Sequence, residues 1–238
     1  MTGVIDSTPH GRKTQTVPPT HMSTPPSDRL AARQTEAIAA AGGSPFEAAL
    51  AVIAGFPAAV CPNLRPAAGH NAALRAQEAT ALKAWAVQTN HFHDGDTFDR
   101  RWREQGEMGG SENDIYYEEA SGLVWKRNRI EVFCLSWRQF FDRILLHDFL
   151  FPEAPLRFEG VLEHEGALHG VCSQPDIVAK RGAWRDETET MMQARGYRRR
   201  SNDDYEGLLL LVEDLHEGNV LVDENGRLIV IDPAIFPR

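Results

Sequence analysis

The chain has 238 residues, 42% of them hydrophobic, and a formal net charge of −9 at pH 7. This length suits one domain of ordinary size with an appendage, and the negative charge argues against a general binder of nucleic acids or acidic membranes. The three cysteines are widely separated and form no CxxC pair, which favours a reduced, cytoplasmic protein over a disulfide framework. The longest aliphatic run, at 208–212, is too short to cross a bilayer.

The amino-terminal part of the chain divides into a tail and a helical extension. Residues 1–28 are rich in Pro, Thr and Ser, and they cannot bury enough surface to offset their ordering entropy, so we expect a disordered tail. Residues 29–104 are expected to form a helical extension. Its clearest helix begins at Ser44, an N-cap residue followed by Pro45 at the first helical position and by Glu47 three residues after the cap.

A second helix is predicted over about 71–90. Glu78 interrupts its apolar face, so the amphipathic pattern is moderate. The apolar side chains of that face are Leu74, Ala81, Leu82 and Trp85.

After about residue 105 the pattern changes to short strands and helices. Turn residues at Ser121–Gly122 and Glu165–Gly166 predict two hairpins, and Gly196 ends a helix. The predicted order is hairpin, helix, strand pair, helix and final hairpin, at 113–127, 136–151, 157–175, 183–194 and 212–236. This order indicates an α+β fold without a βαβ rhythm.

The final hairpin carries polar side chains at its outer ends. Asn225 and Gly226 predict a two-residue turn, in which opposed residue numbers add up to 451 and Asn219 faces Asp232. Opposed side chains lie within about 5 Å, and an amide and a carboxylate that close could supply oxygen ligands for Mg²⁺. A longer loop over 223–226 would make the contact diagonal, and simple capping of the strand ends is the plain alternative.

Asp214 precedes Asn219 by five residues, which is the D-x-x-x-x-N spacing of the protein-kinase catalytic loop. At this point the sequence resembles the protein-kinase-like fold. The resemblance implies that Asp214 orients or deprotonates the acceptor hydroxyl, and that Asn219 and Asp232 hold Mg²⁺. His216, inside the same loop, would orient the loop or approach phosphate, with a structural hydrogen bond as the alternative.

The upstream parts follow in the order that a kinase requires. The resemblance implies an ATP site with a phosphate loop, a phosphate-binding lysine at the end of "LVWK", and a hinge at 172–178 that contacts the adenine. A solvated strand end is the alternative for that lysine. The residues matching these parts are Gly109, Gly110, Ser111, Lys126 and Gln174.

Residues from about 75 to 236 together resemble the polyvalent-protein kinase domains of bacterial mobile elements and phages. The resemblance implies a compact, truncated, two-lobed kinase-like fold, with 105–238 as a minimal kinase-like domain. Two departures stand out: Val212 and Glu213 replace the His-Arg before the catalytic Asp, and Pro233 and Ala234 replace the Phe-Gly after the metal-binding Asp. No clear glutamate partner for the lysine is visible, although Asp142 and Glu153 are candidates.

Three functions therefore stay open. The first is a Mg-ATP-dependent phosphotransferase acting on a protein or a small molecule. The second is a nucleotide-binding module, catalytically weak or inactive, that acts by binding a partner protein. The third is a metal-dependent hydrolase centred on "HFHDGDTFD" at 91–99, where His91, His93, Asp94 and Asp96 could ligate a metal, unless they form a plain solvated loop. The basic run at 195–200 could bind phosphate or RNA, or could complement a helix C-terminus.

Overall fold

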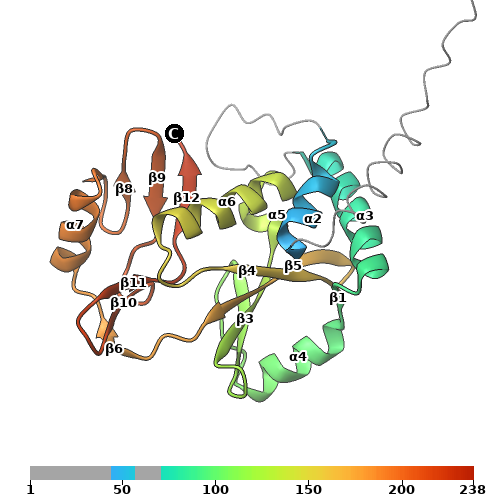
Figure 1. The fold of residues 1–238 in the computed structure, drawn as a ribbon, viewed down its shortest axis with the longest axis horizontal. Coiled ribbons are helices and arrows are strands. Elements are labelled where there is room, and N and C mark those ends of the chain that lie inside the picture. The colour runs from blue at the N-terminus through green and yellow to red at the C-terminus, as the bar shows by residue number, and fades with distance from the viewer. Residues whose placement is uncertain (1–43, 57–70) are drawn as a thin grey trace, which may run out of the picture.

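A computed structural model describes residues 44–56 and 71–238. The expected disordered tail at 1–28 lies outside these ranges. The described elements, labelled as in Figure 1, are α2 (Pro45–Ile53), α3 (Ala72–Thr89), β1 (Phe92–His93), α4 (Gly95–Glu104), β2 (Asn113–Glu118), β3 (Leu123–Asn128), α5 (Ile130–Phe133), α6 (Trp137–Leu150), β4 (Arg157–His164), β5 (Ala167–Pro175), β6 (Ala179–Gly182), α7 (Arg185–Ala194), β7 (Arg198–Arg199), β8 (Tyr205–Glu206), β9 (Leu210–Glu213), β10 (Val220–Asp223), β11 (Leu228–Val230) and β12 (Ala234–Pro237).

The elements form two lobes joined after β5, as Figure 1 shows. The N-terminal lobe holds a sheet in the order β1-β4-β5-β3-β2, in which only the β1–β4 pair is parallel. The C-terminal lobe holds a sheet in the order β11-β10-β6 and another in the order β12-β9-β8-β7, together with α7. This mixture of helices and antiparallel sheets is the predicted α+β class.

Local signals in the sequence set most element boundaries. The Ser44 hydroxyl accepts a hydrogen bond from the Glu47 N–H at 3.3 Å and caps α2. Glu165 and Gly166 both have positive φ, as a two-residue type I′ turn requires, and they join β4 to β5. Gly196 follows α7 with a φ of 84°. These predicted starts, turns and stops are confirmed.

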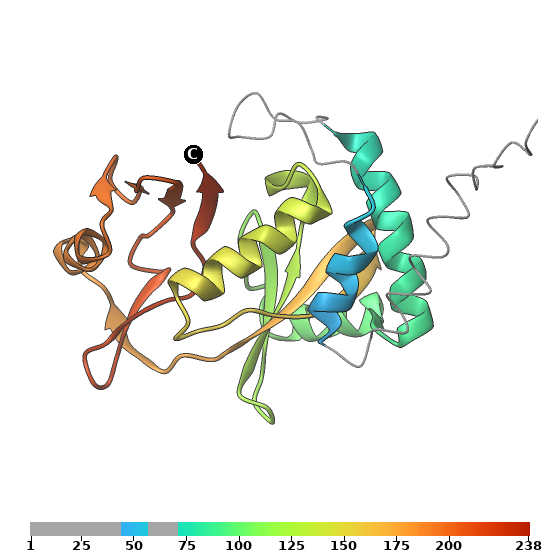
Figure 2. The same cartoon turned by 45° about the horizontal axis from the view of Figure 1, so that its top comes forward.

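The sheet of the N-terminal lobe is covered on both faces. Helices α2, α3 and α6 pack on one face around Trp85, Phe141 and Phe158, and Figure 2 shows α2 lying beside α3. The side chains of Phe98 and Tyr116 pack on the other face, which α4 covers. These contacts join the described helices of the predicted N-terminal extension to the sheet.

The turn of the final hairpin differs from the prediction. Val220 pairs with Val230 and Val222 with Leu228, so opposed numbers add up to 450 rather than 451. The loop has three residues, of which only Gly226 has positive φ, because the Asp223 carboxylate accepts hydrogen bonds from the Asn225 and Arg227 N–H groups and stabilises a wider turn. Asn219 therefore lies opposite Ile231, not Asp232, and the Ile231 N–H donates to its carbonyl at 3.0 Å.

Glu78, the residue that interrupts the apolar face of α3, is almost fully buried, at 1% exposure. Its carboxylate accepts the backbone N–H of Trp137 at 2.8 Å, which is one of the unpaired N–H groups in the first turn of α6. Burial is the main cause of a raised pKa at Glu78, and it outweighs the hydrogen bonds from Trp137 and Arg138. The side chain thus joins α3 to α6 at an electrostatic cost.

We predict opposite outcomes for two substitutions of Glu78. Glu78→Ala leaves the Trp137 N–H without its acceptor and should lower the free energy of unfolding by about 1–3 kcal/mol. Glu78→Gln keeps an acceptor without the buried charge and should match or exceed the wild type at pH 7. A raised folded-state pKa means that the wild type loses stability relative to Glu78→Gln as pH rises from about 4 through that pKa. Chemical denaturation at several pH values would measure both effects, and equal losses in the two variants would contradict this role.

Candidate functional site

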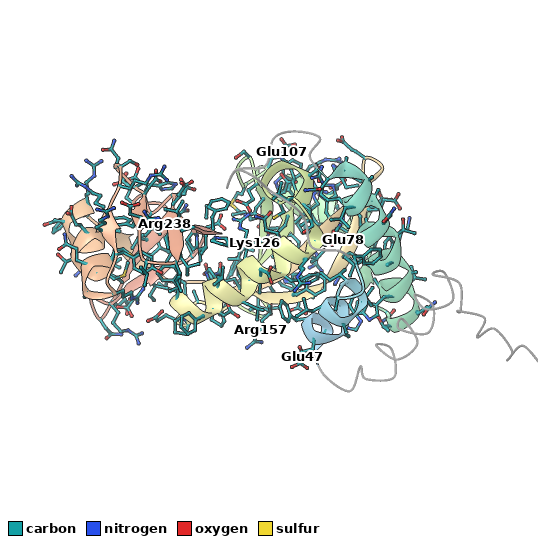
Figure 3. All side chains as sticks on the ribbon, turned by 90° about the horizontal axis from the view of Figure 1, so that it is seen from above. Glu47, Glu78, Glu107, Lys126, Arg157 and Arg238 are labelled. Atoms are coloured by element: carbon teal, nitrogen blue, oxygen red, sulfur yellow. The ribbon has the colours of Figure 1, made fainter. Side chains whose placement is uncertain are left out.

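A cavity of about 1030 Å³ lies between the two lobes. Figure 3 places Lys126 near the middle of the molecule, between the two groups of elements. Every residue that the sequence analysis selected for the site lines this one cavity: Gly109, Gly110, Ser111, Lys126, Gln174, Asp214, His216, Asn219 and Asp232. Residues more than a hundred positions apart in the chain are thus brought together.

Lys126 reaches the cavity from the sheet of the N-terminal lobe. Strand β3 continues to Asn128, and Lys126 is only 4% exposed, so it is not a solvated strand end. Its ammonium group donates to the Ile231 carbonyl at 3.1 Å and to Asp232 Oδ1 at 3.3 Å. A buried ammonium needs such partners, because an unpaired charge in the interior is costly.

Neither candidate for a carboxylate partner of this lysine, Asp142 on α6 or Glu153 just after it, forms an ion pair with Lys126. Glu153 forms an ion pair with Arg195 at 3.8 Å. The pKa of Asp142 is raised by burial, and the nearby charge of Arg138 only partly offsets this rise. Within residues 44–56 and 71–238, Lys126 forms an ion pair with Asp232, at 3.3 Å. The negative charge that balances this ammonium group therefore comes from the C-terminal lobe and not from α6.

Strand pairing brings Asp214 close to Asp232. Glu213 at the end of β9 pairs with Ala234 at the start of β12, so the two aspartates lie next to neighbouring strand ends. Asp214 has a φ of 68°, in the left-handed region. Its backbone N–H donates to Asp204 Oδ1 at 3.3 Å, which holds the chain in this turn.

Asn219 connects the two aspartates. Its side-chain nitrogen donates to the Asp214 carbonyl at 2.9 Å, to Asp214 Oδ2 at 3.0 Å and to the Asp232 carbonyl at 3.0 Å. The predicted proximity of Asn219 and Asp232 is therefore present, although the contact is made through the Asp232 backbone. Amide and carboxylate oxygens are hard ligands, and this donor set fits a cation such as Mg²⁺.

The protonation of Asp214 depends on its neighbours. The cavity walls partly desolvate this carboxylate, even though 60% of the side chain is exposed, and this desolvation raises its pKa. The charge of His216, whose Nε2 lies 3.6 Å from Asp214 Oδ1, lowers the pKa, and the charge of Asp232 raises it. The carboxyl thus titrates above the ordinary range of an aspartate.

A tight turn before β2 forms the glycine-containing edge of the cavity. The Gly110 N–H donates to the Asn113 carbonyl at 2.8 Å, and the Ile115 N–H donates to the Met108 carbonyl at 3.0 Å. Gly109 has a φ of 132°, and a Cβ there would lie 2.2 Å from the Asn113 carbonyl oxygen. Gly110 has open space around it. The turn therefore requires glycine at the first position and tolerates a side chain at the second.

Gln174 lies at the edge of the cavity where β5 leads into the second lobe. Its side chain is buried and donates to the Ala154 carbonyl at 2.6 Å. The following Asp176 N–H donates to the Gly122 carbonyl at 2.9 Å. The Gln174 amide thus stabilises the connection between the lobes, and its predicted contact with a nucleotide stays a prediction.

Two residues at the site were missed by the sequence analysis. Asn113 donates from its side-chain nitrogen to both carboxylate oxygens of Asp232, at 3.4 and 3.3 Å. Asp204 supports the backbone of Asp214 as described above. Both contacts depend on tertiary pairing, and nothing in the local sequence distinguishes these residues from ordinary strand and loop positions.

The rival metal site at 91–99 has a structural explanation. His91 Nδ1 lies 3.0 Å from the Thr89 hydroxyl, and His93 Nε2 lies 3.1 Å from the Glu159 carbonyl. Asp94 caps α4 by accepting the Asp96 N–H at 3.2 Å. Nowhere in the described part of the chain do three or more His, Cys, Asp or Glu side chains form a metal-binding group. These contacts favour the plain structural explanation of this segment over the predicted metal site.

The basic run at 195–200 is largely neutralised by ion pairs. Each of its four arginines lies near a glutamate. The pairs are Arg195–Glu153, Arg198–Glu206, Arg199–Glu189 and Arg200–Glu213. This arrangement favours a surface charge network over a site for phosphate or RNA.

Comparison with known proteins identifies the family. Curated proteins and solved structures give no match. None of the helices within 44–56 and 71–238 has the length and hydropathy of a membrane-spanning helix. A family model described as "Serine/Threonine/Tyrosine Kinase found in polyvalent proteins" matches residues 75–236, which begin inside α3 and end in β12. With most of its length matched and its two lobes arranged around one cleft, the chain belongs to this kinase family, as the resemblance implied.

Proposed function

We propose that the protein is a phosphotransferase that uses Mg-ATP. The observation that supports this most strongly is the convergence of Lys126, Asp214, Asn219 and Asp232 on one cavity from both lobes. A lysine for phosphates, oxygen ligands for a metal and a carboxylate for an acceptor hydroxyl are the groups that phosphoryl transfer requires. Positioning and charge stabilisation account for most of the catalysis in such reactions.

The nucleotide would lie along the N-terminal lobe. Lys126 would exchange part of its contact with Asp232 for the phosphate oxygens, because its ammonium group already faces the cavity. The turn at Gly109–Ser111 would let phosphates come close to its backbone, because Gly109 and Gly110 have no side chains. Backbone groups near Gln174, at the connection between the lobes, would face the base.

The metal would be held by Asn219 and Asp232. Asn219 uses its nitrogen for Asp214 and for the Asp232 carbonyl, so its oxygen is the end left for a ligand. A bound Mg²⁺ would neutralise charge that develops on the transferring phosphate. Asp232 would also keep Lys126 in place until the nucleotide enters.

The acceptor would be bound by Asp214, whose exposed carboxylate faces the cavity. It would accept a hydrogen bond from the acceptor hydroxyl and orient its oxygen towards the phosphate. His216 would stabilise the ionised form of Asp214. The acceptor is a protein or a small molecule with a hydroxyl group.

A second candidate function is nucleotide binding without transfer. The pairing of Lys126 with Asp232, instead of with a carboxylate on α6, favours it, because active protein kinases hold this lysine by an ion pair with a glutamate on the helix. In this case the protein would act by binding a partner once the nucleotide is bound. Binding and transfer must therefore be measured separately.

Asp232→Ala tests the transferase proposal. The wild type should transfer radiolabelled phosphate from ATP to an acceptor, or to itself, with or without added cell extract. The variant should lose this transfer by roughly a hundredfold or more, the scale of losing a main electrostatic contact to the transferring group. Wild-type protein that binds Mg-ATP but transfers no label would favour the second candidate, and wild-type protein that binds no nucleotide would contradict both.

The pH dependence of transfer should reflect Asp214. Only the ionised carboxylate accepts the hydroxyl hydrogen, so the raised pKa should place the acidic limb of the pH–rate profile above the range of an ordinary aspartate. His216→Gln removes a charge that lowers this pKa, so the acidic limb should move to higher pH. His164→Gln, whose side chain pairs with Asp99 and does not line the cavity, is the matched control. An unchanged limb in His216→Gln would contradict the assignment of Asp214.

The two glycines of the turn should respond differently to alanine. Gly109→Ala forces a Cβ against the Asn113 carbonyl at positive φ, a strain of about 1–3 kcal/mol that should distort the turn and weaken Mg-ATP binding. Gly110→Ala has open space and should bind nearly as well as the wild type. Calorimetric titration of both variants checks this, and equal affinities would show that the turn does not contact the nucleotide.

A further inference from the structure

Helix α6 carries an arginine, Arg143, that contacts two residues of the cavity wall, Glu112 and Phe236. Arg143 is largely buried, with 12% of its side chain exposed, and its guanidinium donates to Glu112 Oε1 at 2.5 Å. It also lies 3.8 Å from Cys134 Sγ and 5.7 Å from the centre of the Phe236 ring. The side chain therefore contacts the glycine turn of one lobe and strand β12 of the other.

Glu112 is the partner that makes this arginine relevant to the site. It lies in the turn between Gly110 and Asn113 and lines the cavity. Its backbone carbonyl accepts the Arg129 N–H at 2.9 Å, and 26% of its side chain is exposed. Without Arg143, the Glu112 carboxylate would be an uncompensated negative charge beside the part of the cavity where phosphates would enter.

We propose that Arg143 is a positioning residue for the phosphate end of the nucleotide site. It neutralises Glu112 and holds that carboxylate against α6, so that the turn can accept a polyanion. This inference rests on the proposed function, and it adds a role for α6 that differs from the lysine–glutamate contact used elsewhere in the kinase fold. Here α6 carries a positive charge, on Arg143, and it pairs with Glu112 of the glycine turn instead of with Lys126.

Electrostatics distinguishes this role from a purely structural one. Replacing both members of a buried ion pair by neutral groups is often nearly neutral for stability, whereas removing one leaves the other charge unpaired. A loss of the arginine alone should therefore repel phosphate, and a loss of both charges should not. Phe236 provides a flat surface under the guanidinium, which supports a neutral side chain of similar length.

The test compares Arg143→Met, Glu112→Gln and the double variant in full-length protein. Arg138→Met, an exposed arginine on the same helix, is the matched control. Calorimetric titrations with Mg-ATP, Mg-ADP and adenosine measure how the effect depends on phosphate charge. Arg143→Met should weaken Mg-ATP binding at least about tenfold, Mg-ADP binding by less, and adenosine binding hardly at all. The double variant should recover most of the Mg-ATP affinity.

Several outcomes would overturn the inference. Mg-ATP binding by Arg143→Met within twofold of the wild type would do so, and so would an equal loss for adenosine, because a structural defect would affect all three ligands. If circular dichroism shows that Arg143→Met does not fold, the double variant tests the inference alone. It must then bind Mg-ATP within about threefold of the wild type, and weaker binding would overturn the inference. A wild type that binds no nucleotide would overturn the proposed function as well, whereas a wild type that binds Mg-ATP independently of Arg143 would overturn this inference alone.

Discussion

The contact of Lys126 with the C-terminal hairpin is the interaction on which the site depends. One buried ammonium group extends from the sheet of the N-terminal lobe to the Ile231 carbonyl and the Asp232 carboxylate of the other lobe. Since a buried charge without partners is costly, this contact favours a fixed approach of the two lobes. The cavity then has a cationic end next to its acidic groups before any ligand is present.

Two strand pairings supply the partners for that lysine. The pairing of β9 with β12 brings Asp214 near Asp232, and the pairing of β10 with β11 sets Asn219 opposite Ile231. The backbone of the hairpin thus carries the lysine acceptor, and its side chains carry the candidate metal ligands. Asn113 adds hydrogen bonds to the Asp232 carboxylate, so two side chains of the N-terminal lobe, Lys126 and Asn113, hold this group of the C-terminal lobe.

Features set by near neighbours could be predicted from the sequence, and those set by tertiary contacts could not. The Ser44 cap, the Glu165–Gly166 turn and the spacing of Asp214 and Asn219 depend on residues within five positions, and the structure has them as expected. The predicted strand register of the final hairpin was wrong by one residue, because the Asp223 side chain stabilises a three-residue loop. The hydrogen bond from the Trp137 N–H to the buried Glu78 and the Arg143–Glu112 pair both depend on how α6 packs, which no local pattern in the sequence indicates.

The backbone of Asp214 limits how this position can be studied. Its φ of 68° is one that Gly, Asn and Asp adopt readily, whereas other residues lose about 1–2 kcal/mol there. An alanine at this position would therefore mix the loss of a carboxylate with a change of the loop that carries Asn219. Asparagine keeps the backbone preference and removes only the charge, which makes it the informative replacement. The same conformational requirement narrows the side chains that evolution could place at this point of the loop to a small, polar set.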